Sequence, residues 1–210
     1  MSAIIDSLIE RYPALSGARQ SIETLCQWLV ETYANGNRLL VAGNGGSCAD
    51  AEHIAGELLK SFKYHRPIDP VDQDILRSFG EEGIILADNL EDGLPCIALN
   101  SHIGFVTAFC NDVDPNLFYA QQLYAQARKG DLFLGISTSG NAKNIYYAML
   151  AARVKGVRSV LLTGNKHGKC EKLAELVVSV PAGEPYLVQE YHLPIYHAMC
   201  ALVEEHFYGK

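Results

Sequence analysis

Two short segments of the chain combine glycine with hydroxyl and amide side chains, and each follows an apolar run. The first lies in VAGNGGSCADAEH and contains Asn44, Gly45, Gly46 and Ser47. The second lies in LGISTSGNAKN and contains Ser137, Thr138, Ser139 and Gly140. Backbone amides and hydroxyls of this kind can donate hydrogen bonds to phosphate oxygens without a lysine.

The glycine-rich segment at 43–47 favours an anion for two reasons. Its glycines permit a tight turn and a close approach of a ligand to the backbone. Ser47 can cap the helix that should follow, and the free amides of that helix attract negative charge. The spacing differs from the dinucleotide-binding G-x-G-x-x-G turn, and no Gly-Lys-Ser/Thr follows as in a P-loop.

Helix capping and turn formation would by themselves explain either segment. Both segments, however, follow a predicted strand, and open parallel sheets bind ligands beyond the carboxyl ends of their strands. We therefore predict that the two turns together bind a phosphorylated ligand.

A second group of residues has the types needed for metal binding or acid–base chemistry. His53 and Glu57 lie four residues apart on a predicted helix, which places both on one face. Gln189 and His197 lie eight apart on the last predicted helix, an angular offset of roughly 80°. His192 is as good a candidate as His197, and a histidine satisfied in the core or at the surface explains either position equally well.

Apolar periodicity predicts an α/β fold, in which a parallel sheet has helices on both faces. Five buried strands are expected at 38–43, 94–100, 131–137, 157–162 and 174–180. Helices are expected at 2–11, 14–34, 47–62, 101–110, 115–129, 141–155 and 187–207. We expect a single domain over 1–210, with N-terminal helices in 1–36 that pack against a partner subunit. Residues 64–93 form an insertion with a short helix near 72–79.

The composition limits the class of protein. The chain has 210 residues, of which 49% are hydrophobic and 20% charged, enough for one full core. Its net charge of −7 argues against a general surface for nucleic acid or anionic membranes. The six cysteines form no CxxC pair, which favours a reducing, cytoplasmic setting. We expect no signal peptide and no membrane span.

Taken together, these motifs resemble the sugar isomerase (SIS) domain family and, within it, the phosphoheptose isomerases. The resemblance covers nearly the whole chain. The matching stretches are GNGGS (43–47), HIAGEL (53–58), RP (66–67), LPCIAL (94–99), ND (111–112), GDLFLGISTSGN (130–141), LTG (162–164) and QEYHLPIYH (189–197). GNGGS with STSGN is specific for the family, and the spacing of the His, Glu and Gln residues is specific for the isomerase branch.

The resemblance implies aldose–ketose isomerisation of a phosphorylated sugar, most directly sedoheptulose 7-phosphate, by a homotetramer with sites between subunits. It implies zinc or another divalent metal, one per site, held by His53, Glu57, Gln189 and His197. It also implies that Glu57 and His197 are the acid–base pair. The sugar-phosphate contacts that it implies are Asn44, Gly45, Gly46, Ser47, Glu57, Asn111, Asp112, Ser137, Thr138, Ser139 and Gln189.

Three departures from the family pattern leave the identity of the sugar open. Ala142 stands where members often carry a further serine, and Tyr186 stands where they carry an acid. The 64–93 insertion is much longer than in typical heptose enzymes.

Two other functions compete with the enzyme. A non-catalytic SIS protein would bind a sugar phosphate or a replication-initiation protein, but such relatives lose the glutamate and final histidine that this chain keeps. A sugar-phosphate sensor would need a DNA-binding domain, and residues 1–36 are too short and acidic for one.

Overall fold

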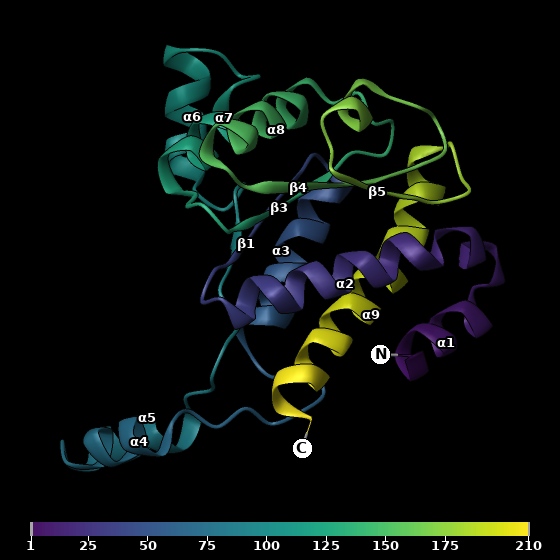
Figure 1. Ribbon diagram of the computed structural model, residues 1–210. Helices are drawn as coiled ribbons and strands as arrows, with labels where there is room; N and C mark the ends of the chain where they lie inside the picture. The colour runs from purple at the N-terminus through teal and green to yellow at the C-terminus, as the bar shows by residue number, and fades with distance from the viewer. Residues whose placement is uncertain (1, 210) are drawn as a thin grey trace.

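A parallel five-stranded sheet forms the centre of the computed structural model, which describes residues 2–209 (Figure 1). The strands are β1 (Leu39–Gly43), β2 (Cys96–Ala98), β3 (Leu132–Ile136), β4 (Arg158–Thr163) and β5 (Leu176–Ser179). Their order across the sheet is β2-β1-β3-β4-β5, and every neighbouring pair is parallel. The predicted α/β class is confirmed. The expected strand at 94–100 is reduced to three residues at the sheet edge.

Helices connect the strands and cover both faces of the sheet. The α-helices are α1 (Ser2–Arg11), α2 (Arg19–Ala34), α3 (Gly46–Leu59), α4 (Pro70–Arg77), α5 (Glu81–Asn89), α6 (Ile103–Asp112), α7 (Phe118–Gln126), α8 (Lys143–Lys155) and α9 (Pro185–Tyr208). Two short 3₁₀ helices are η1 (Pro13–Ala18) and η2 (Lys169–Lys172). The single helix expected at 14–34 is thus divided into η1 and α2.

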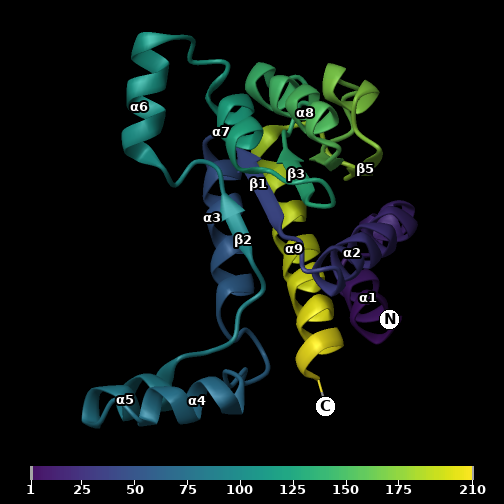
Figure 2. The same cartoon turned by 60° about the vertical axis from the view of Figure 1, so that its left-hand side comes forward.

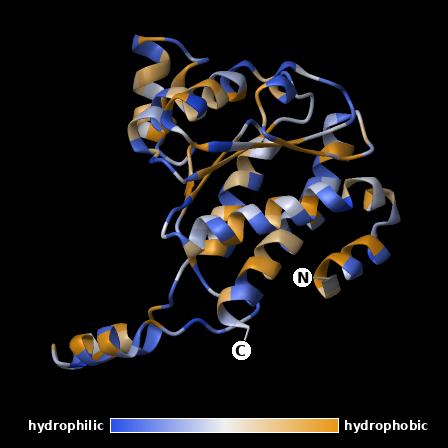
Figure 3. Ribbon diagram, viewed as in Figure 1, coloured by the Kyte–Doolittle hydropathy of each residue, from blue (hydrophilic) through white to orange (hydrophobic). Residues whose placement is uncertain are grey.

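Alternating side chains of the strands divide the core into two layers. Leu39, Val41 and Leu134 point to the face that α1, α2, α3 and α9 cover. Leu40 and Phe133 point to the opposite face, which α7 and α8 cover. Figure 3 shows the sheet as a predominantly hydrophobic band between these layers. The sheet is therefore buried on both sides, as the near-continuous apolar runs of its strands predict.

The register of the central strands brings the two polar turns together. β1 pairs with β3, and Gly43 lies opposite Ile136 at their carboxyl ends. The chain leaves β1 into the glycine-rich turn and leaves β3 into the Ser-Thr-Ser-Gly turn. Both turns consequently lie side by side at the carboxyl ends of the sheet strands.

The helix α9 is a continuous element of 24 residues that packs against α1, α2 and α3 (Figure 2). It continues through Pro194 without interruption. Helix α3 leaves the glycine-rich turn, and α9 runs beside α3. Side chains of these two helices can therefore converge further along α3 from that turn.

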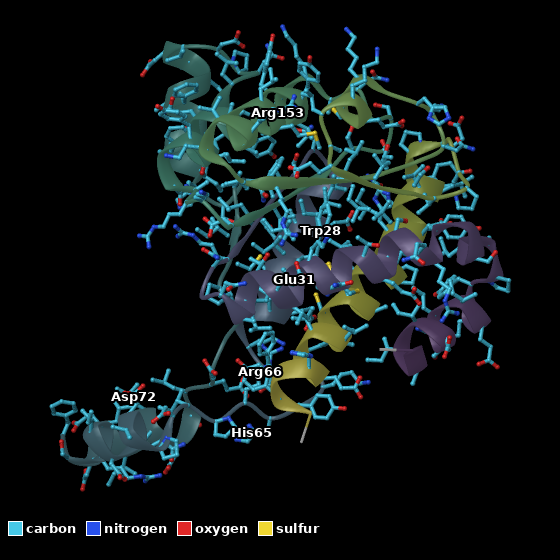
Figure 4. All side chains as sticks on the ribbon, in the orientation of Figure 1. Trp28, Glu31, His65, Arg66, Asp72 and Arg153 are labelled. Carbon is cyan, nitrogen blue, oxygen red and sulfur yellow. The ribbon has the colours of Figure 1, made fainter. Side chains whose placement is uncertain are left out.

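The helices α4 and α5 form a helical arm (residues 70–89) that extends away from the body of the molecule (Figures 1 and 2). One short helix was expected here, and the structure has two. No residue of α4 is buried. The arm is instead held at its root, where Arg66 lies beside the end of α9 (Figure 4).

The root of the arm is fixed by a buried ion pair. The Nε atom of Arg66 donates to Glu204 Oε1 at 2.8 Å, and neither side chain is exposed to solvent. The same glutamate accepts from the backbone amides of Phe62 and Lys63. Breaking one member of such a pair would leave an uncompensated buried charge, so this contact fixes the chain that follows α3.

The helix α6 also stands apart from the sheet (Figure 2). None of its residues is buried, and Ile103 is 71% exposed. Among the described residues, no helix is long and apolar enough to cross a membrane.

Candidate active site

The glycine-rich turn is shaped by backbone geometry rather than by a serine cap. Gly45 occupies the position before α3 with φ 57°, a left-handed conformation that favours glycine. Helix α3 begins at Gly46, so Ser47 lies inside its first turn and makes no capping hydrogen bond. The expectation that Ser47 caps the helix is therefore wrong. The free amides of the first helical turn remain available at this end of α3.

The Ser-Thr-Ser-Gly turn uses two of its hydroxyls to hold its own shape. Ser137 Oγ accepts from the Ala142 amide at 3.3 Å, and Ser139 Oγ accepts from the Asn141 amide at 3.2 Å. Each hydroxyl can still donate its own proton to a ligand oxygen. Capping and ligand binding, which the sequence leaves as alternatives, are thus compatible at both serines.

A pair of asparagines that was not predicted from the sequence joins the two turns. Asn44 Nδ2 donates to Asn144 Oδ1 at 2.9 Å, and Asn144 Nδ2 donates back to Asn44 Oδ1 at 2.8 Å. Asn44 belongs to the first turn, and Asn144 lies in the first turn of α8 after the second. The reciprocal pair fixes the orientation of the Asn44 amide and the spacing of the two turns. In the sequence, this pair is indicated only by Asn144, the polar residue that ends the stretch GNAKN.

Gln189, in the first turns of α9, contacts the glycine-rich turn directly. A side-chain carbon added at Gly46 would lie 2.7 Å from both the Nε2 and Oε1 atoms of Gln189. Only glycine leaves room for this amide, which connects α9 to the start of α3.

His53, Glu57 and His197 converge further along the same two helices. His53 Nε2 lies 3.1 Å from Glu57 Oε1 and 3.5 Å from His197 Nε2. Burial lowers the pKa of His197, and the neighbouring His53 lowers it further. His53 follows Gly46 by seven residues, so this cluster lies about 10 Å along α3 from the glycine-rich turn.

Two further side chains, Tyr196 and Asp50, lie on the Nδ1 side of the His53 ring. His53 Nδ1 lies 3.0 Å from the hydroxyl of Tyr196, which donates to Asp50 Oδ1 at 3.3 Å. Burial raises the pKa of Asp50, while the hydrogen bond from Tyr196 and the nearby His53 oppose the rise. Neither residue was a sequence candidate, although Asp50 lies one helical turn before His53.

A hollow of about 450 Å³ opens beside His197, between α1 and α9. Arg11 and Lys63 line it with Phe62, so its wall is partly cationic. The histidine is therefore accessible from the side of the N-terminal helix.

The donor atoms of the cluster suit a divalent metal, but no complete site is formed. Two imidazoles and a carboxylate are ordinary zinc ligands, and the ligand atoms of a tetrahedral zinc lie about 3.3 Å apart. Glu57 Oε2 is buried without a hydrogen-bond partner. Within residues 2–209, however, no three His, Cys, Asp or Glu side chains are arranged as a finished metal site. Gln189, the fourth predicted ligand, contacts Gly46 rather than this cluster.

Other sequence candidates lie elsewhere. Asn111 and Asp112 are exposed at the end of α6, where they hydrogen-bond to each other at 2.9 Å and to neither turn. His192 is fully buried in α9, and neither of its ring nitrogens is hydrogen-bonded. The choice that the sequence left open between His192 and His197 is therefore resolved by geometry: only His197 reaches the cluster.

Comparisons with known proteins bear on the family and the fold of this chain. A family model described as the SIS domain matches residues 5–73. A phosphoheptose isomerase of Aneurinibacillus thermoaerophilus is 40% identical over 88% of this chain and 80% of its own length. The structure of a phosphoheptose isomerase from Neisseria gonorrhoeae matches 94% of this chain and 98% of its own, with a TM-score of 0.69 and 26% identity. The phosphoheptose isomerase structure from Francisella tularensis shares the fold, with a TM-score of 0.77 over 95% of this chain at 24% identity.

The fold and these relatives together define an SIS-domain protein of the isomerase class, which is a class of enzymes. Within that class, the chain belongs to the phosphoheptose isomerase family.

Proposed function

We propose that this enzyme interconverts a ketose phosphate and the corresponding aldose phosphate, most directly sedoheptulose 7-phosphate and a heptose 7-phosphate. The observation that carries the proposal is the convergence of His53, Glu57 and His197 on helices that start beside two phosphate-type turns. Relatives named phosphoheptose isomerase support the substrate.

In this proposal the two turns bind the phosphate. The backbone at Gly45 and Gly46 and the hydroxyls of Ser137, Thr138 and Ser139 donate to its oxygens. Asn44, Ser47 and Gln189 complete the contacts along the sugar. An anchored phosphate positions the far end of an extended sugar chain at the cluster about 10 Å along α3, which reduces the entropic cost of reaching the transition state.

Glu57 and His197 then move the proton between the two reacting carbons. Aldose–ketose isomerisation passes through an enediol, which needs a base at the carbon acid and a group that handles the proton on oxygen. Burial lowers the pKa of His197, which favours the neutral imidazole that proton acceptance and metal binding both require. The carboxylate of Glu57 is only 15% exposed, which limits competition from water.

His53, Glu57 and His197 would hold zinc or another divalent metal, one per site, with Gln189 as a fourth ligand after its side chain turns away from Gly46. When bound, such an ion polarises the sugar oxygens and stabilises the charge that develops on them. The family resemblance and the donor set support this metal.

Asn111 and Asp112 complete the site only if α6 moves or if another subunit supplies them. We propose a homotetramer with sites between subunits, which the unburied faces of α6 and of the helical arm support. A cytoplasmic location is consistent with six free cysteines among the described residues.

Two positions bear on the choice of sugar. Ala142 offers no hydroxyl to the phosphate, and its backbone amide is already bonded to Ser137. Tyr186, which stands where the family resemblance implies an acid, is 62% exposed at the start of α9. Both leave the phosphate anchor in place and alter the surroundings of the sugar.

The sequence alone also left open a non-catalytic SIS protein that binds a sugar phosphate or a replication-initiation protein. The retention of Glu57 and His197 in contact distance of His53 favours the enzyme.

A screen of ketose phosphates with five to seven carbons for aldose formation tests the proposal. We expect turnover with sedoheptulose 7-phosphate and loss of turnover after exhaustive chelation, restored by added zinc. Binding of the sugar phosphates without any aldose product would favour the non-catalytic alternative. Full activity in the chelated enzyme would remove the metal from the mechanism.

A further inference from the structure

A buried ion pair joins the two helices that carry the proposed reacting groups, close to the end of each helix. Arg66 and Glu204 are both fully buried, and Arg66 Nε donates to Glu204 Oε1 at 2.8 Å. Such a pair is often no more stable than apolar side chains of similar volume, because both charges lose their hydration. The contacts that the pair makes beyond itself therefore deserve an explanation other than stability.

The guanidinium of Arg66 connects this ion pair to Glu57. Its Nη1 atom donates to the carbonyl of Leu58 at 2.8 Å, and its Nη2 atom donates to the carbonyl of Glu57 at 3.3 Å. Both carbonyls lie in the last turn of α3, where the helix itself offers them no donor. Arg66 thus fixes the piece of backbone from which the Glu57 carboxylate projects.

The carboxylate of Glu204 connects the same ion pair to His197. Its two oxygens accept from the backbone amides of Phe62 and Lys63, each at 2.7 Å. The Phe62 ring lies against the imidazole of His197, with 5.8 Å between the ring centroids and 36° between the ring planes. Glu204 follows His197 by seven residues, which places both on one face of α9. Glu204 consequently holds Phe62 in place beside His197.

We propose that Arg66 and Glu204 are positioning residues for the isomerisation, which set the separation between the Glu57 carboxylate and the His197 imidazole. The inference rests on the proposed function, in which these two groups transfer the proton. Each member of the ion pair reaches one reacting residue through a single intermediate: Arg66 through the α3 backbone, and Glu204 through the Phe62 ring. A misplacement of about 1 Å can lower a rate about 10²-fold, so the pair should act on turnover rather than on substrate binding.

The double variant Arg66→Met with Glu204→Gln removes both charges at once, so that no unpaired charge remains in the core. Arg38→Met with Asp131→Asn is the matched control. Asp131 is 2% exposed, accepts from Arg38 Nε at 3.2 Å and accepts from two backbone amides, as Glu204 does. This control pair precedes β1 and β3 and so lies at the opposite end of the sheet from the two turns.

Steady-state kinetics of the full chain separate positioning from binding. We expect the turnover number to fall about 10- to 100-fold in the Arg66→Met, Glu204→Gln variant, with KM within about twofold, and both constants to stay within about twofold in the control. Phe62→Leu leaves the ion pair intact and should also lower the turnover number at an unchanged KM, which keeps a test available if the double variant does not fold. An unchanged turnover number in the folded double variant or in Phe62→Leu, or an equal loss in the control, would overturn the inference.

A nuclear Overhauser effect between the Phe62 and His197 rings reports the positioning without any turnover. We expect this effect in the unsubstituted chain and in the control, and its loss in the Arg66→Met, Glu204→Gln variant. Its retention there would contradict a positioning role for the ion pair. Absence of aldose formation by the unsubstituted chain would count against the proposed function, whereas the ring contact would still decide whether the ion pair positions His197.

Discussion

At the residue scale, the site is organised by contacts between amide and imidazole side chains from distant parts of the chain. Asn44 and Asn144 are one hundred residues apart, yet each donates to the other. The Asn44 amide is consequently held in one orientation before any ligand arrives. Pre-organised hydrogen-bonding groups of this kind lower the cost of binding.

Replacing Asn144 by alanine should weaken substrate binding without disturbing the reacting groups. The substitution releases the Asn44 amide and the spacing of the two turns, so we expect KM to rise about tenfold, the equivalent of one net hydrogen bond of about 1.4 kcal/mol. The turnover number should change little. Steady-state kinetics on Asn144→Ala measure this effect, with Asn35→Ala as a control, because the exposed Asn35 amide donates only to the Glu31 carbonyl of α2. An unchanged KM would show that the pair has no part in binding.

The sequence predicted part of this residue-scale picture. His53 and Glu57 were identified because a four-residue spacing on a helix guarantees a shared face. Asn144 and Tyr196 could not be identified in this way, since their partners lie on other elements and only the register of β1 with β3 and the packing of α3 on α9 bring them together. The pairing of Gln189 with Gly46 likewise depends on tertiary contact.

At the scale of elements, the helical arm extends from the body of the described chain, and its first helix, α4, buries none of its residues. Val71, Ile75 and Phe79 follow each other at intervals of four, and are 65%, 52% and 69% exposed. A stripe with this spacing is normally buried against another surface. The arm is anchored only at its root by Arg66 and Glu204, so its apolar face does not stabilise the body of the same chain.

Polar substitutions on this stripe should therefore affect assembly more than folding. We expect Val71→Ser with Ile75→Ser to shift the protein to smaller oligomers while thermal unfolding of the body changes by only a few degrees. Light scattering coupled to size-exclusion chromatography measures the assembly. Asp72→Ser with Asp74→Ser changes polar residues of the same helix and serves as the control. An identical oligomer for the apolar and acidic pairs would contradict a role for the arm in assembly.

The elements themselves were largely predictable. All five strands were expected from apolar runs, and the order of strands and helices was expected from their alternation. The second helix of the arm was not expected, because its glycines at 80 and 83 argue against a helix when only local propensity is considered. In the structure Gly80 precedes α5 with φ 88°, and Gly83 lies against the Leu76 backbone, where a side chain would collide.

At the scale of the whole molecule, one buried histidine should couple folding to pH. Burial lowers the pKa of His192 from 6.5 to about 4, because the core disfavours the charged imidazolium. The unfolded chain takes up a proton at this residue below about pH 6.5, whereas the folded chain does so only near pH 4. Stability should therefore be lost progressively as the pH falls from about 6.5 to about 4, by about 3 kcal/mol.

Urea unfolding at a fixed protein concentration between pH 4 and 7 measures this dependence. His192→Met removes the ionisable group from the core and should flatten the curve by that amount, whereas His167→Met, at an exposed position, should leave the slope unchanged. A His192→Met curve as steep as that of the unsubstituted protein would assign the acid sensitivity to other groups.

In the function that we propose for the whole molecule, two phosphate-type turns position a sugar at Glu57 and His197. The most direct test is the rate at which the purified enzyme and its Glu57→Gln variant convert sedoheptulose 7-phosphate to an aldose. We predict a loss of at least about 10²-fold in the variant, as expected for removal of a general acid–base group, with the same oligomer and retained binding of the sugar phosphate. Turnover of the Glu57→Gln variant within a few-fold of the unsubstituted enzyme would contradict the account.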